Sequence, residues 1–359
     1  MAVFRKRREH SPAFAAAPTP DITAAAGSAT QIGTLYAYSV GAGVERALTV
    51  PTISRARDLI ASMIGSLDLR QYTLQWTGEY YEELAIPGES WFTRPDPTVT
   101  RNWLMANTFS DLLFYGRAFW YVSSRYNTGF PASFQWLPAG SVETPDQTGP
   151  QFFGMSKQID FLGNQIDANN VVQFLSPIQG LLYTGHRAID MALRLDMAAR
   201  RFASNEIAAG YLQCREGGEP LSGEELADLA AAWSKARAAN AIGALNQYVE
   251  FKEFSADPSK LQLMEGREHA ALELARVANI PPYLVGIPTG GMTYQNAQQA
   301  RQDLYLFGAK PYICCIEETL SLDTVTPRGR HVKFDVESYL SGERYMDNEE
   351  EVIRETEVM

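Results

Sequence analysis

Apolar residues follow two different spacings along the first third of the chain. Apolar residues recur every three or four positions in residues 51–67 (PTISRARDLIASMIGSL) and 100–116 (TRNWLMANTFSDLLFYG), which predicts two amphipathic helices. Pro51 suits the first turn of a helix. Residues 67–76 (LDLRQYTLQW) alternate apolar and polar positions, which is typical of a strand. Ordered structure is therefore expected to begin near Pro51.

Several short segments bounded by Gly, Pro, Asn or Asp follow the second helix. They are RAFWYVSSR (117–125), SFQWLP (133–138), QIDFLG (158–163) and NNVVQFL (169–175). Such segments predict a meander of antiparallel strands. Helices and strands are grouped rather than strictly alternating, so residues 48–182 are predicted to form an α+β domain.

The middle of the chain is dominated by helical periodicity. Residues 183–205 (YTGHRAIDMALRLDMAARRFASN) predict a rod of about 33 Å at 1.5 Å per residue, with Ile189, Leu193 and Met197 on one stripe. Residues 258–279 predict a second rod, which the following IPP would end. Between the rods lie a strand (YLQC), a helix opened by Ser222 and Glu225 as a capping box, and a strand (QYVEFKEFS). These segments predict a hairpin of rods with a small cap at its tip.

A stretch rich in proline and glycine, PPYLVGIPTGGMTYQN (281–296), follows the second rod. Its glycines permit backbone conformations closed to other residues, while its prolines keep parts of it stiff. Residues 293–322 then predict a long helix, bent near Gly308 and Pro311. HVKFDV (331–336) predicts a final strand, and an acidic tail follows.

Composition narrows the range of functions. The chain has 359 residues and a formal charge of −11, so as a whole it would repel a phosphate backbone, and tight sequence-specific nucleic-acid binding is not expected. Three cysteines are interpreted as reduced, buried residues of a cytosolic protein. No apolar run reaches the ~20 residues of a membrane span, and the basic start does not lead into a signal-peptide core.

No catalytic constellation stands out. The four histidines show no metal-ligand spacing, GAGVER lacks the third glycine of a dinucleotide loop, and no phosphate-binding GxxxxGK[ST] is present. The basic start (RKRR, 5–8) is either a solvated terminus or a contact for nucleic acid or an acidic partner. Four arginines on the first rod, interleaved with Asp190 and Asp196, are expected to form pairs on the helix surface.

An ordered series of phrases resembles the portal proteins of long-tailed, siphovirus-like bacteriophages. It spans about residues 50–322 and comprises ARDLIAS, LLFYGRAFWYV with FQWLP, GLLYTGHRAIDMAL, RRFASNEIAAGYL, ANIPPYLVG, TYQNAQQ and PYICCIEETLS. The resemblance implies an α+β portal fold with an α/β wing, a two-helix stem, a small α/β clip and a channel-facing tunnel loop. The implied parts are a flexible arm (1–47), wing (48–182), stem helix (183–210), clip (211–256), second stem helix (257–280), tunnel loop (281–295), second part of the wing (296–340) and an acidic tail or reduced crown (341–359).

The resemblance also implies a function without catalysis. Family members form a ring, typically of twelve copies, at one capsid vertex, through which double-stranded DNA is packaged and later ejected. The implied partners are other copies of the chain, DNA bound without sequence preference, the terminase large subunit, the head-tail adaptor and the major capsid protein. No enzyme activity, cofactor, metal or membrane is implied. The protein would be assembled in the host cytoplasm and reside in the virion.

Two sets of residues are the candidate sites under this resemblance. A weakly gripping, flexible loop suits a passing polyanion, because apolar side chains make no ion pairs with phosphate. The expected tunnel-loop residues are Tyr283, Leu284, Val285, Gly286, Ile287, Gly290, Gly291, Met292 and Tyr294. The expected partner-binding residues of the clip are Glu216, Glu219, Glu224 and Glu225.

Two alternative functions remain open from the sequence. In one, the protein is an α+β enzyme whose Gly/Pro stretch is a lid over a small-molecule pocket. In the other, it is a capsid-associated adaptor that has no DNA channel.

Overall fold

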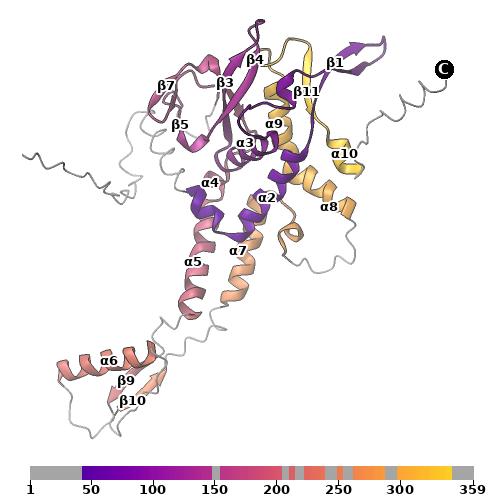
Figure 1. Ribbon diagram of the computed structural model, residues 1–359. Coiled ribbons are helices and arrows are strands. Elements are labelled where there is room, and N and C mark those ends of the chain that lie inside the picture. The colour runs from indigo at the N-terminus through magenta and orange to yellow at the C-terminus, as the bar shows by residue number, and fades with distance from the viewer. Residues whose placement is uncertain are drawn as a thin grey trace, which may run out of the picture.

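A computed structural model describes residues 43–147, 154–203, 210–214, 222–238, 249–253, 262–287 and 297–341 (Figure 1). Residues 43–48 already form a helical turn, and Ala47 is fully buried in the core. Helical structure is therefore present a few residues before the expected boundary, where Gly43 lies against Leu182. The remainder of the predicted arm and the acidic tail after residue 341 lie outside the described residues.

Two helices form the centre of the core. Helix α2 (Pro51–Ser66) begins at the predicted proline and packs against α3 (Arg101–Tyr115). The Thr100 side chain caps α3 by accepting a hydrogen bond from the backbone N–H of Trp103 at 3.2 Å. Gly65 permits the close contact of the two helices, because a Cβ there would lie 2.9 Å from the carbonyl oxygen of Asn102.

The predicted meander is confirmed as a pair of small antiparallel sheets. Strand β3 (Arg117–Arg125) lies between β4 (Pro131–Leu137) and β8 (Val171–Leu175). The second sheet has the order β5 (Val142–Glu143), β6 (Ile159–Phe161) and β7 (Asn164–Ile166). Single 3-10 turns occur at Ser90–Phe92, Ala139–Ser141 and Ala168–Asn170.

The third sheet joins the two ends of the domain. Strand β1 (Leu69–Trp76) pairs on one side with β2 (Tyr81–Ile86), which the sequence pattern did not predict. On its other side β1 pairs with β11 (Arg330–Phe334), so that Leu69 lies opposite Phe334. Helix α9 (Lys310–Leu320) packs against β11 and β8, and α10 (Val336–Ser341) follows. Residues from both ends of the chain thus share one hydrophobic core.

The predicted bend in the long C-terminal helix is also confirmed. Helix α8 (Ala297–Asp303) continues into a π-helical segment, Leu304–Ala309, and then into α9. Pro311 has no N–H to donate to the preceding turn, and the π-helical segment lies directly before its helix. Gly308 lies against α2, because a Cβ there would be 3.0 Å from Cδ1 of Ile60.

The first predicted rod is interrupted near its start. A short helix α4 (Leu181–Thr184) ends at Gly185, and α5 (His186–Ala203) then begins. A side chain at position 185 would lie 2.9 Å from Val277 of the second rod, so glycine permits this close approach. The second rod is α7 (Leu263–Val277). Figure 1 shows α5 and α7 extending side by side away from the sheets.

The segment between the two rods contains a small α/β unit. Strands β9 (Gly210–Cys214) and β10 (Val249–Glu253) pair antiparallel, and α6 (Gly223–Ala238) lies between them in sequence. The predicted strand, helix and strand are all confirmed. Figure 1 shows this unit beyond the far ends of α5 and α7.

Candidate functional site

The paired helices α5 and α7 contact each other through small and apolar residues. Ala270 and Leu274 of α7 are buried, and a Cβ on Gly266 would lie 3.5 Å from Cδ2 of Leu195 in α5. Ile189 is buried as the predicted stripe requires, but Met197 is 53% exposed and lies outside the contact. The pair therefore has a narrow internal seam and leaves much of its surface uncovered within one chain.

One of the expected surface pairs of the first rod is present, and a second ion pair joins the two helices. Arg194 lies 2.7 Å from Asp190, one turn earlier on α5, and Arg267 of α7 lies 3.2 Å from Asp196 of α5. All four side chains are largely exposed, and such pairs contribute only about 0.2–1 kcal/mol. The second pair connects α5 to α7 at their surface.

Helix α7 ends in a left-handed residue rather than at the prolines. Asn279 has φ 53°, its N–H donates to the carbonyl of Arg276, and the N–H of Ile280 donates to that of Ala275. This is the hydrogen-bond pattern of a Schellman motif. The Asn279 side chain also donates to the carbonyl of Phe307 at 2.6 Å, which fixes the helix end to the π-helical segment.

The first half of the predicted tunnel loop is a packed turn. Pro282–Val285 form a 3-10 helix, which Gly286 ends with φ 84°. Leu284, Val285 and Ile287 are partly buried against the hydrophobic core. These three apolar side chains therefore contribute to packing within one chain.

A tyrosine fixes this turn to the helix that follows the loop. The Tyr283 hydroxyl donates to Oδ2 of Asp303 in α8 at 2.8 Å. Partial burial, followed by the hydrogen bond to Asp303 and its negative charge, raises the pKa of Tyr283 to about 12. Sequence reasoning missed both Asn279 and Asp303 as anchors, because neither has a local motif that reveals its distant partner.

The second half of the loop lies between two fixed points. Gly290, Gly291, Met292 and Tyr294 lie outside the described residues, which resume at Ala297. The packed turn and α8 are the anchors on either side of that segment. Residues 281–287, the described part of the candidate loop, are therefore anchored at both the α7 and the α8 side.

The acidic residues expected to bind a partner have different positions. Glu224 and Glu225 are exposed in the first turn of α6, whereas Glu216 and Glu219 lie outside the described residues. Glu225 forms the predicted capping box, since it accepts a hydrogen bond from the N–H of Ser222 at 2.8 Å and its own N–H donates to Ser222 Oγ. Hydrogen bonds from Ser222 lower the pKa of Glu225.

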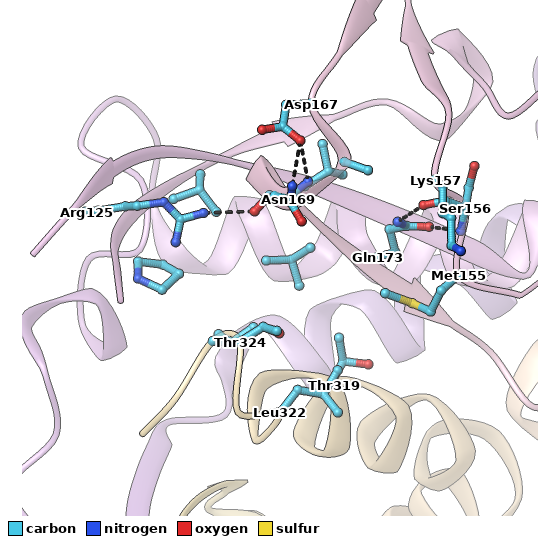
Figure 2. A pocket seen from close by; sticks show the side chains of 16 residues that line it. Arg125, Met155, Ser156, Lys157, Asp167, Asn169, Gln173, Thr319, Leu322 and Thr324 are labelled. Atoms are coloured by element: carbon cyan, nitrogen blue, oxygen red, sulfur yellow. Dashed lines mark hydrogen bonds between the residues drawn. The ribbon is translucent and has the colours of Figure 1, made fainter. Parts of the chain in front are cut away.

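The α+β domain contains two cavities that are separate from this site. One of about 490 Å³ lies between β3, β8 and the segment after α9, and its lining is shown in Figure 2. Another of about 360 Å³ is lined by Asp111 of α3 and Trp136 of β4. Neither is lined by the turn at 281–287, so the described part of the Gly/Pro stretch does not cover either of them.

Asp111 is an unusual group that the sequence did not reveal. Its Oδ2 accepts hydrogen bonds from Trp136 Nε1 at 2.9 Å and from the N–H of Ala139 at 3.1 Å. Burial raises the pKa of Asp111 to about 7, although these two hydrogen bonds act in the opposite direction. The carboxyl connects α3 to the end of β4 and is therefore a structural element that responds to pH.

Within the described ranges, no group of three or more His, Cys, Asp or Glu side chains could hold a metal ion. In that same part of the chain, every helix is too short or too polar to cross a membrane.

Comparisons with known proteins agree with this architecture. The phage portal protein family matches residues 51–351. The crystal structure of an HK97 family phage portal protein from Corynebacterium diphtheriae has a TM-score of 0.65 and 25% identity, covering 83% of this chain and 96% of that one. No individually curated protein sequence matches.

Two further structures share the fold alone. A chain in the neck of an empty gene transfer agent particle matches with a TM-score of 0.55 and 19% identity, covering 86% of this chain and 92% of that one. A chain in the neck of the native particle, computed with C12 symmetry, matches with a TM-score of 0.55 and 18% identity, covering 80% of each chain. Because the family match extends over most of the sequence, from the first core helix to beyond the last one, this chain belongs to the phage portal protein family.

Proposed function

We propose that this protein assembles into a ring at a single capsid vertex and forms the conduit through which double-stranded DNA enters and leaves. The family match over residues 51–351 carries the proposal. The C12 symmetry of the related gene transfer agent neck supports a ring of twelve copies. Closed rings of identical chains need two different, complementary surfaces on each chain. The virion is then the site of action, after assembly in the host cytoplasm.

The parts of the chain have distinct roles in this proposal. Residues 48–182 and 296–340 form the wing, which is supported by their shared core and by the β1–β11 pairing. Residues 183–210 and 257–280 form the stem, which is supported by the packing of α5 against α7. Residues 211–256 form the clip, whose β9–β10 pair and α6 make a separate small unit.

The tunnel loop surrounds the passing DNA in this arrangement. Residues 288–295, with Gly290, Gly291, Met292 and Tyr294, face the channel, while Tyr283 to Ile287 hold the base of the loop. An uncharged loop makes no ion pairs with phosphate, so it would contact the duplex without retaining it. The overall charge of −11 also disfavours retention of the DNA, because a negative surface shortens the time that a polyanion stays bound.

The clip would meet the terminase large subunit during packaging and the head-tail adaptor afterwards. Glu216, Glu219 and Glu224 are the proposed contacts, because exposed carboxylates increase the rate of encounter with a basic surface. Glu225 has a structural role in the capping box as well. The wing faces the major capsid protein. The family is structural, and we assign no catalytic step or cofactor to this chain.

A packaging assay tests the proposal. Empty capsids containing this protein are mixed with terminase, ATP and linear DNA, and the DNA protected from nuclease is measured. Protection should require this protein and should be lost when capsids are assembled without it. Equal protection with and without this protein would contradict a conduit role.

A further inference from the structure

The outer half of the β1–β2 hairpin projects beyond its sheet. Strand β11 pairs with β1 only from Leu69 to Thr73, whereas β1 and β2 continue to the pair Trp76 and Tyr81. Figure 1 shows the hairpin on one side of the wing, opposite the side where β5 and β7 lie. Isolated two-stranded ribbons are marginally stable in water, so this extension would be stabilised by a covering surface.

The projecting hairpin carries a concentration of exposed apolar side chains. Of the fifteen large hydrophobic residues that are exposed among the described residues, four belong to it, namely Leu74, Trp76, Tyr80 and Tyr81, and a fifth, Leu84, lies at its base opposite Thr73. The rings of Trp76 and Tyr81 lie 4.9 Å apart and form one aromatic knob. Exposed clusters of this kind mark protein contacts, and Trp and Tyr are enriched where binding energy is concentrated.

The cavity of about 490 Å³ is complementary to the hairpin in its size and in the residues that line it. Its volume lies in the ~300–1,000 Å³ range of pockets that hold drug-sized groups, so an aromatic side chain fits. Two further exposed hydrophobic residues, Met155 and Leu322, belong to its lining. Figure 2 shows Met155 and Lys157 on one side of the cavity and Leu322 and Thr324 across from them.

Hydrogen bonds between neighbouring residues fix the wall of the cavity. Gln173 of β8 exchanges hydrogen bonds with the backbone of Ser156, at 2.9 Å to its N–H and 2.8 Å to its carbonyl. Arg125 is fixed by hydrogen bonds to the carbonyls of Gly129 and Asn169. The lining thus holds its shape before anything enters, which lowers the entropic cost of binding.

We propose that the β1–β2 hairpin of one subunit inserts its aromatic knob into this cavity on the next subunit. Charge favours a second copy of the chain as the occupant, because the hairpin carries Glu79 and Glu82, whereas the cavity carries Arg125 and Lys157 against one carboxylate, Asp167. The knob and the cavity are different surfaces of the same chain, which is the requirement for a head-to-tail ring. This inference rests on the proposed ring.

Cysteine cross-linking of the full-length protein tests the contact. The double variant Glu79→Cys, Lys157→Cys should give, on mild oxidation, a reductant-sensitive ladder of linked chains up to the size of the ring. A mixture of the two single variants should give linked dimers and nothing larger, because each chain then has one new thiol. Each single variant alone controls for Cys214, Cys314 and Cys315 and should remain monomeric on the denaturing gel.

A charge exchange provides the second measurement. Glu82→Lys should slow ring assembly at low salt on the order of tenfold, and adding Lys157→Glu should restore it. Rings that form without the ladder, or hairpins that cross-link to the major capsid protein instead, would overturn the contact and leave the proposed function standing. Absence of rings from the unsubstituted protein would overturn the proposed function and this contact together.

Discussion

The Tyr283 hydroxyl donates a 2.8 Å hydrogen bond to Oδ2 of Asp303, and this bond connects the turn after α7 to α8. Residues 288–296 lie between these two elements in sequence, so the bond closes the base of the proposed tunnel loop. The pKa of Tyr283 is raised to about 12, so the phenol remains a donor at any pH at which a phage is handled. The hydrogen bond thus fixes the base of the proposed loop.

The substitution Tyr283→Phe should loosen this base. It removes one hydrogen bond to a charged, partly exposed acceptor, so we expect a loss of roughly 0.5–1.5 kcal/mol in the free energy of unfolding. Amide hydrogen exchange should accelerate at 281–287 and 297–303 more than in α2. Tyr121→Phe, which removes a hydroxyl from β3, away from the loop and from the β1–β2 hairpin, is the matched control. Unchanged exchange in the Tyr283 variant would show that the hydrogen bond does not fix the loop.

Stability should decrease as pH rises from about 4 to about 7, because of Asp111. Its pKa is 3.8 in the unfolded chain and about 7 in the folded protein, so the folded state binds the extra proton in this window. The associated stabilisation is present below pH 4 and is lost as pH rises to 7. At 1.36 kcal/mol for each pKa unit, the full effect is on the order of 4 kcal/mol.

Asp111→Asn should remove this pH dependence while keeping an oxygen that accepts from Trp136 and Ala139. Unfolding by denaturant at pH 5 and pH 8 measures the difference directly, and the wild-type protein should lose more stability between these two values than the variant. Parallel losses in the two proteins would assign the effect to other groups.

A deletion within the loop separates gating from assembly. Removal of residues 289–292 retains Gly286, whose positive φ ends the 3-10 turn, and retains the Tyr283 anchor. We expect such variants to form rings and to package or retain less DNA, since the channel is no longer narrowed. Substitution of Met292 by Leu, with the loop length unchanged, is the control. Normal DNA retention by rings with the deletion would argue against a gating role.

The two exposed carboxylates of α6 should behave differently on substitution. Glu224→Lys is expected to weaken terminase binding while the capping box of Ser222 and Glu225 stays intact. Glu225→Lys also breaks the capping box with Ser222, so it should reduce the helicity of the clip more than Glu224→Lys does. Binding measured with immobilised rings, together with circular dichroism, separates these effects. Full terminase binding by Glu224→Lys would remove this residue from the interface.

Most helices and strands could be predicted because their signals are local. The spacing of apolar residues placed α2, α3, α5 and α7, and the bend near Gly308 and Pro311 followed from the known effects of those two residues. Strand β2 was missed because YEELAI is polar and exposed, so it shows no buried face. The alternation of apolar and polar residues reflects the burial of one face of a strand, and a projecting strand has little buried surface.

The loop was only partly predictable for a related reason. Composition indicated a stiff and glycine-hinged segment, but not that Leu284, Val285 and Ile287 pack against the core. That packing depends on where α2 lies, more than 200 residues earlier in the chain. The anchors Asn279 and Asp303 likewise depend on tertiary contacts that no local motif records.

The most direct test of the account is an image of the purified full-length protein viewed down its symmetry axis. Negative-stain electron microscopy, with the mass of the same sample measured by light scattering, should show rings of about twelve subunits around a central hole. A protein that stays monomeric at high concentration, even with its capsid partners supplied, would contradict the account.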